Sequence, residues 1–185
     1  MSSSSATAPD PSTLPLELPV DLEADNPLWQ FALMLWQQPK VEASCLALQA
    51  QGWSVTRLLC AAWLSVRGRT FTGAEDATVT EWRRRVTGAL RSARKTLPTD
   101  LAPYHKLRSG LAALELEAEQ IELALAWKTL MTDNPDHADM QGSDTLIHTN
   151  LAAAAPGSSV EQRALPLIHA LAGALAQLSM GDHKP

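Results

Sequence analysis

Residues 26–69 read NPLWQFALMLWQQPKVEASCLALQAQGWSVTRLLCAAWLSVRGR, and their pattern is that of consecutive short helices. Asn26 is a typical helix N-cap, proline follows at the first helical position, and apolar residues then recur three and four apart. Pro39 ends this helix, because the residue before a proline avoids the α region. The pattern predicts a first helix that begins at Pro27 and stops before Pro39.

Two more short helices are predicted in the same stretch. One runs from about Lys40 to Gln51, with Gly52 as its C-terminal cap, and the other follows Ser54 as N-cap and ends at Gly68. In the first of them we expect Val41, Cys45, Leu46 and Leu48 to face inward. Tight connections between the three helices favour one compact unit. A few large anchors are expected to do much of the packing in the chain, since six of its nine aromatic residues are tryptophan, at positions 29, 36, 53, 63, 82 and 127.

A helical hairpin is predicted next. A helix from about Glu75 to Leu97 has an apolar face and an opposite basic face. The apolar face comprises Val79, Trp82, Val86, Ala89, Ala93 and Leu97. After a turn at 98–100, a second helix reaches about Met131. Its apolar seam has heptad-like spacing and comprises Leu107, Leu111, Leu114, Ala118, Ile121 and Leu125.

The remaining segments are expected to surround this helical domain of residues 26–131. Residues 1–25 hold five acidic residues and no basic one, which predicts a disordered acidic leader. We expect a flexible acidic linker at 132–157, an apolar C-terminal helix at 158–180 capped by Ser158 and Glu161, and a disordered tail at 181–185. The expected fold is all-α: a compact three-helix Trp-rich unit packed on a long antiparallel helical hairpin, plus a C-terminal helix.

The last helix is apolar but does not resemble a membrane span. It is short, it is interrupted by Pro166 and His169, and residues 164–181 carry no formal charge. We expect it to dock on the core of its own chain, with a groove on a partner protein as the alternative.

Basic residues gather in the middle of the chain, where ten of the fifteen lysines and arginines lie between positions 67 and 108. If the hairpin turns at 98–99, Arg83, Arg84 and Arg85 approach Glu115, Glu117 and Glu119 and are neutralised. The tip then has basic groups opposed only by Asp100, beside one aromatic ring, a combination suited to a polyanion. The candidate polyanion-binding residues are Arg91, Arg94, Lys95, Tyr104, His105, Lys106 and Arg108. An ordinary solvated basic face explains the same pattern.

The sequence predicts no catalytic residue, no metal site and no cofactor. Glu115, Glu119 and Glu122 share a helical face but lack the Glu-x-x-His spacing of helical metal sites. The acidic run at 133–139 lacks the glycine and the bidentate glutamate of a calcium loop. Cys45 and Cys60 lie in apolar helical runs, which favours buried thiols. The N-terminus does not have the pattern of a secretory signal, so we expect a cytoplasmic protein.

The motifs NPLWQFALMLW, PKVEASCLALQ, GWSVTRLL and AAWLSVRGR resemble an uncharacterised proteobacterial family described only as a domain of unknown function. The resemblance covers about residues 26–131 and implies a compact helical bacterial protein without a known activity. Three functions stay open. The first is a non-enzymatic helical interaction or adaptor protein with a protein partner, the second is a nucleic-acid- or ribosome-associated factor that uses the hairpin tip, and the third is an enzyme whose site the sequence does not reveal.

Overall fold

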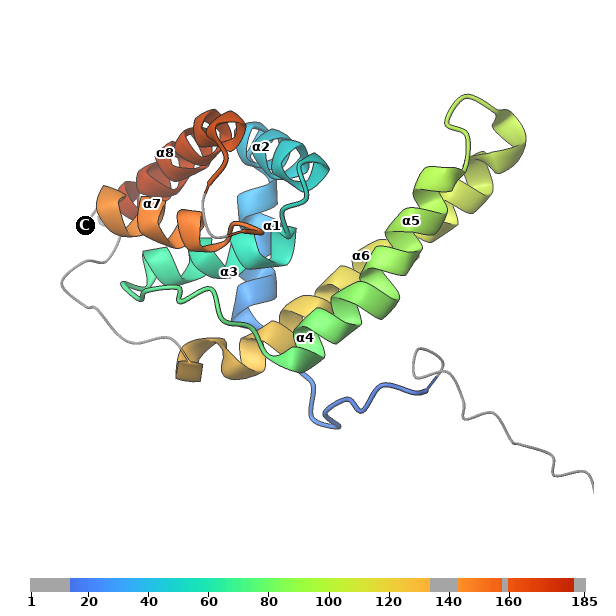
Figure 1. Ribbon diagram of the computed structural model, residues 1–185, viewed down its shortest axis with the longest axis horizontal. Helices are drawn as coiled ribbons and strands as arrows, with labels where there is room; N and C mark the ends of the chain where they lie inside the picture. Colours follow the sequence, from blue (N-terminus) through green and yellow to red (C-terminus); the bar gives the residue numbers. More distant parts are fainter. Residues whose placement is uncertain (1–13, 134–142, 158–159, 182–185) are drawn as a thin grey trace, which may run out of the picture.

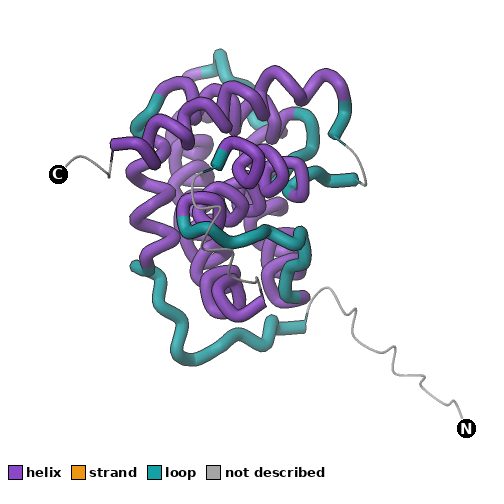
Figure 2. The backbone as a smooth tube through the Cα atoms, turned by 90° about the vertical axis from the view of Figure 1, so that its left-hand side faces the viewer, coloured by secondary structure: helices purple, strands orange, loops and turns teal. Residues whose placement is uncertain are grey.

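The computed structural model describes residues 14–133, 143–157 and 160–181, and every regular element within these ranges is helical (Figure 1, Figure 2). The all-α prediction is confirmed. In chain order the elements are α1 (Pro27–Trp36), α2 (Pro39–Ala50), α3 (Val55–Val66), α4 (Ala77–Trp82), the π-helix η2 (Arg83–Thr87), α5 (Gly88–Thr96), α6 (Ala102–Asp133), α7 (Asp144–Ala153), the 3-10 helix η4 (Gln162–Ala164) and α8 (Leu165–Gly181). Within the described ranges, no helix combines the length and the apolar character that crossing a membrane requires.

The first three helices begin and end where the sequence indicates. The Asn26 side chain accepts a hydrogen bond from the Trp29 amide at 3.0 Å, and Ser54 accepts one from the Arg57 amide at 3.3 Å. Gly52 and Gly68 follow α2 and α3 with φ values of 90° and 68°, a conformation that favours glycine. One inward position is wrong, because Leu46 is exposed on α2.

Helices α1, α2, α3, α7 and α8 pack together and are called the body, and α5 and α6 form the hairpin. Tryptophan side chains join the body to the base of the hairpin. Trp63 of the buried helix α3 packs edge-on against Phe31 of α1 and against Trp127 of α6, with ring centroids 5.3 Å and 5.7 Å apart. Helix α3 is buried on most of its circumference, as expected of a central helix. The same core therefore fixes α1, α3 and the C-terminal half of α6.

The region predicted as a linker contains a core helix. Helix α7 begins after Ser143, whose side chain accepts from the Leu146 amide at 3.2 Å, and it buries Leu146, Ile147 and Leu151. The linker prediction is therefore wrong for 144–153, because acidic residues beside the helix hid its apolar face. Residues 134–142 lie outside the described ranges.

Helix α8 docks on its own chain, as expected, against α2 and α7 (Figure 1). Ile168, Leu171 and Leu175 are buried there. The expected cap residue Ser158 and the end of the tail, residues 182–185, lie outside the described ranges.

Residues 14–25 run along the hairpin without regular structure. Asp21 pairs with Lys128 Nζ at 2.5 Å. The side-chain amide of Gln120 donates to the Ala24 carbonyl at 3.2 Å, and Arg85 donates to the carbonyl of Leu14. The expectation of a disordered leader does not hold for this part of it. Residues 1–13 lie outside the described ranges.

Figure 1 shows α5 and the N-terminal half of α6 extending away from the body as an antiparallel hairpin. Helix α6 has 32 residues, and its contacts with α1 and α3 leave its distal part against α5. The body and the projecting hairpin are thus the two walls between which a cleft lies.

Candidate functional site

A π-helix at the base of the hairpin changes which side chains face α6. The Gly88 amide donates to the Arg83 carbonyl, five residues earlier, so this turn holds one residue more than an α-turn. Beyond it, Ala89 and Ala93 are exposed although the sequence predicts them inward, whereas Arg91 and Arg94 are half-buried. The predicted face is therefore displaced by about one position after residue 87.

Arg91 and Arg94 are not unpaired cations at a tip. Arg91 Nε donates to Glu115 at 2.7 Å and its Nη2 donates to Glu119 at 2.6 Å, while Arg94 Nε donates to the other oxygen of Glu115 at 2.6 Å. The expectation that only Asp100 opposes the cations near the turn is wrong. Arg83, Arg84 and Arg85, which were expected to meet Glu115, Glu117 and Glu119, pair instead with Glu75, Glu122 and Glu81. The hairpin register differs from the one assumed, and the acids meet the cations nearer to the turn.

The other predicted polyanion-binding residues lie toward the end of the hairpin. Arg108 donates to the carbonyls of Arg94 and Leu97 at 2.7 Å and 2.6 Å and so caps the C-terminus of α5. The His105 ring lies 3.2 Å from the Thr99 carbonyl, and Tyr104 and Lys106 are exposed. Lys95 is exposed on α5. The structure thus divides the seven candidates between ion pairs, a helix cap and an exposed group.

The apolar seam of α6 is buried only in its C-terminal half. Ala118 and Leu125 are buried, but Leu107 and Leu114 are 54% and 50% exposed. Tyr104 lies on the same side of the helix and is 40% exposed, and Leu111 between them is half-buried. We call Tyr104, Leu107, Leu111 and Leu114 the outer stripe. It is exposed because α5 covers the neighbouring face, the one with Glu115, Glu119 and Glu122.

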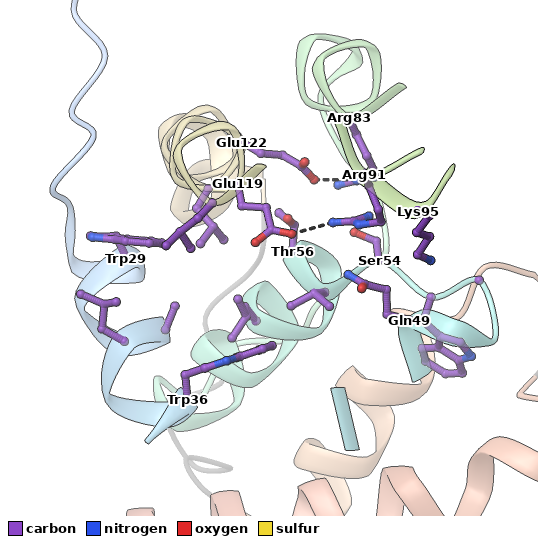
Figure 3. Close-up of a pocket in the computed structure, with 18 residues that line it drawn as sticks. Trp29, Trp36, Gln49, Ser54, Thr56, Arg83, Arg91, Lys95, Glu119 and Glu122 are labelled. Carbon is purple, nitrogen blue, oxygen red and sulfur yellow. Dashed lines mark hydrogen bonds and ion pairs between the residues drawn. The ribbon is translucent and has the colours of Figure 1, made fainter. Parts of the chain in front are cut away.

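A cleft of about 500 Å³ separates the body from the hairpin (Figure 3). Its apolar wall comes mainly from α1, with Trp29, Leu33 and Trp36, and from α6, with Leu116 and Leu123. Its polar wall comes from the end of α2, the start of α3, the π-helix, α5 and α6. These polar residues are Gln49, Ser54, Thr56, Arg83, Arg91, Lys95, Glu119 and Glu122.

Glu119 is the carboxylate nearest the middle of the cleft in Figure 3. Burial raises its pKa above the usual value of 4.5; the charge of Arg91 opposes this shift, and the charges of Glu115 and Glu122 add to it. Glu122 is almost fully buried and accepts from Arg83 Nε at 2.6 Å. Arg83 in turn joins Glu75 at 2.6 Å, and Glu75 joins Arg57 at 2.8 Å. This chain of pairs holds the base of the hairpin against α3.

A family model described as "Protein of unknown function (DUF2390)" matches residues 27–125 of the chain. The chain belongs to this family. The resemblance seen in the sequence is confirmed. All residues that line the cleft, from Trp29 to Leu123, fall inside the DUF2390 region, whereas α7 and α8 fall outside it. A search of curated proteins and a search of solved structures find no match.

The cleft of this DUF2390 protein was not predicted from the sequence, although the sequence holds one signal for it. Trp29, Leu33 and Trp36 form a second apolar row on α1, and apolar residues on most of a helix's circumference are typical of a central, buried helix. In the structure that row lines the cleft, and Leu33 stays 42% exposed. A second apolar row on a short helix thus indicates either a central, buried helix or a helix that lines a cleft.

The cysteines and histidines lie elsewhere. Cys45 and Cys60 are buried free thiols, as expected, and burial raises the pKa of Cys45 to about 12. His148 of α7 and His169 of α8 meet edge to face with ring centroids 5.3 Å apart. Among the residues described, no group of three or more histidine, cysteine or acidic side chains is arranged to hold a metal ion.

Proposed function

We propose that this protein is a non-enzymatic interaction protein that binds a helical segment of a partner protein along the outer stripe. The observation that supports it is the exposure of Leu107 and Leu114, two large apolar side chains at heptad spacing on a projecting helix. An apolar row of this kind on a rigid element is a typical docking face for an amphipathic helix.

The charge arrangement supports an apolar contact over an ionic one. Arg91 and Arg94 are already paired with Glu115, so the hairpin has little unbalanced charge along its middle. A partner helix with leucine or isoleucine at its own heptad positions complements the outer stripe, and its polar residues remain in water.

The test is site-specific photocrosslinking in the full chain. A photoreactive phenylalanine analogue at position 107 or 114 is expected to capture one partner, through a segment with heptad apolar spacing. The matched control is the same analogue at Leu165, an exposed leucine on α8. Leu107→Glu combined with Leu114→Glu is expected to abolish capture, with the helical circular dichroism unchanged.

Capture that is equal from position 165, or capture of a second copy of this chain, contradicts the proposal. So does capture that survives the double glutamate variant. An apolar contact also predicts that raising the salt concentration changes the yield little.

A second candidate is a nucleic-acid- or ribosome-associated factor, and the exposed Tyr104 and Lys106 at the hairpin end favour it. Its binding must weaken steeply with salt, with a slope of roughly −0.9 per neutralised phosphate on duplex DNA. Lys106→Glu with Lys95→Glu is expected to abolish it and to leave crosslinking from position 107 intact. For either function we propose the cytoplasm as the location, since both cysteines are free thiols.

A further inference from the structure

We propose that the cleft between the body and the hairpin binds an amphipathic monoanion, a carboxylate attached to an aliphatic or aromatic group. The carboxylate lies at the start of α3 beside Lys95, and the apolar group lies against Trp29 and Trp36. This site is separate from the outer stripe and does not depend on the proposed function.

The apolar half of the cleft has the size and lining of a small-molecule site. Trp29, Leu33 and Trp36 on α1 lie opposite Leu116 and Leu123 on α6, around a cavity of about 500 Å³. Leu116 is 55% exposed, so a large part of its side chain is in water. Ligand pockets span roughly 300–1,000 Å³ and are mostly apolar with a few placed polar groups. Burial of these side chains by a ligand is therefore favourable.

Within the described residues, the charged side chains around the cleft are paired with one another except for one cation. Two arginines and two glutamates at the base are paired with one another, as are two arginines and two glutamates further along the hairpin. The first set is Arg57, Arg83, Glu75 and Glu122, and the second is Arg91, Arg94, Glu115 and Glu119. Lys95 makes no ion pair in the part of the chain that the structure describes. The surplus of one positive charge matches a ligand with a single negative charge.

The start of α3 provides hydrogen-bond donors on the same side. Ser54 caps the Arg57 amide, but the amides of Val55 and Thr56, the first two helical residues, have no partner within the helix. These amides and the helix dipole favour an anion. Thr56 is only 5% exposed and lines the cleft, and its hydroxyl makes no hydrogen bond to any described residue. A ligand oxygen in the cleft can accept a hydrogen bond from this hydroxyl.

Figure 3 shows how these groups divide the cleft. Lys95, Ser54 and Gln49 lie together on one side, Thr56 and Glu119 lie in the middle, and Trp29 and Trp36 lie on the other side. A molecule with a charged head and an apolar body matches this order. A cationic head is disfavoured by Lys95 and the positive end of α3. Glu119 disfavours a second negative charge.

The test is an NMR titration of the full chain with decanoate, below the concentration at which decanoate forms micelles. The signals followed are those of the backbone amides and of the tryptophan indole N–H groups. Saturable shifts are expected at the Thr56 amide and at the indoles of Trp29 and Trp36. Lys95→Met is expected to weaken the affinity about tenfold, because it removes a cation at the cleft that makes no ion pair with any described residue. Lys106→Met, at the hairpin end, is the matched control and is expected to bind as the native chain does. Thr56→Val keeps the shape of the side chain, removes the hydroxyl, and is expected to weaken binding several-fold.

Decanol and decylammonium separate the contribution of charge from that of the apolar chain. The alcohol is expected to bind more weakly than decanoate, and the cation is not expected to shift the Thr56 amide. Equal affinity for all three, tighter binding of the cation, or an absence of saturable shifts overturns the proposal. A loss of affinity in Lys106→Met as large as that in Lys95→Met overturns it as well.

Discussion

Arg91 and Arg94, one turn apart on α5, donate to the two oxygens of the same Glu115 carboxylate on α6. Glu115 is nearly buried, and each arginine is about one quarter exposed or less. Glu119 also pairs with Arg91, so an ionic cluster of four side chains joins two helices that an apolar seam was expected to join, and Leu107 and Leu114 of that seam are exposed.

Removal of the shared carboxylate tests how far the hairpin depends on it. Glu115→Gln leaves two half-buried arginines with a single remaining acid, Glu119, and is expected to cost about 2 kcal/mol of unfolding free energy. Urea denaturation followed by circular dichroism measures the change. Glu117→Gln, on the exposed side of α6, is the control and is expected to change stability by less than about 0.5 kcal/mol. Equal effects of the two variants would show that the cluster does not stabilise the hairpin.

Stability is expected to depend on acid pH through the same cluster. Burial raises the pKa of Glu115, but hydrogen bonds from Arg94 and Arg91 outweigh it, and the pKa lies below 4.5; Glu75 behaves alike with Arg83 and Arg57. Because ionisation favours the folded state, their contribution is complete above about pH 4.5 and is lost as pH falls through the lowered pKa. The stability difference between the native chain and Glu115→Gln should therefore narrow below pH 4.5.

The contribution of Glu119 to stability is expected to change with pH in the opposite direction. Because its pKa is raised, Glu119 binds a proton more tightly in the folded chain than in the unfolded chain. Its contribution to the free energy of unfolding therefore decreases as pH rises from 4.5 through the folded-state pKa. Relative to the native chain, Glu119→Gln should gain stability over that rise. Urea midpoints across a pH series check both signs, and a constant offset for each variant would contradict them.

Two glycines on the hairpin are expected to respond in opposite directions to alanine. A Cβ at Gly88 would lie 2.8 Å from the Arg83 carbonyl oxygen, which accepts the π-helical hydrogen bond, so Gly88→Ala is expected to cost about 2 kcal/mol. At Gly110 on α6 a Cβ meets nothing within 4 Å, and Gly110→Ala is expected to stabilise by roughly 0.5–1 kcal/mol. Thermal melts distinguish them. A stabilised Gly88→Ala would mean that the π-turn tolerates a side chain.

Asn150 ties α7 to the end of α3 and the loop after it. Its amide donates to Ser65 Oγ at 3.0 Å and to the Arg69 carbonyl at 2.8 Å, and its oxygen accepts from the Phe71 amide at 2.8 Å, all in a fully buried position. Asn150→Ala removes these three buried hydrogen bonds and is expected to cost about 3 kcal/mol.

Hydrogen exchange of the Phe71 amide gives a local readout of the same contact, and it should accelerate in Asn150→Ala more than amides of α5 do. Thr149→Ala, at the exposed neighbouring position, is the control. Native-like protection of Phe71 in the Asn150 variant would exclude the proposed role.

Local sequence patterns were sufficient to predict the helices of residues 26–69 and the presence of the hairpin. Caps at Asn26 and Ser54, the proline at 39 and apolar spacing act within a few residues, so their consequences are visible without a fold. The buried state of Cys45 and Cys60 followed from the same local pattern. Family membership was also recognisable from short motifs in this stretch.

Which helix faces pack against one another depends on the three-dimensional fold and could not be predicted from local patterns. A π-turn at residues 83–87 displaces every later residue of α5 by about one position, and no local pattern announced it. Helix α7 was predicted as part of a linker because it has few large apolar residues, and these are buried only through contacts with α3 and α8. The cleft depends on distant elements in the same way: Trp29, Lys95 and Leu116 converge only when a hairpin of fixed register projects beside the body. The spacing of residues along the chain reflects interactions within a few residues. The register of the hairpin and the formation of the cleft depend instead on the packing of segments far apart in sequence.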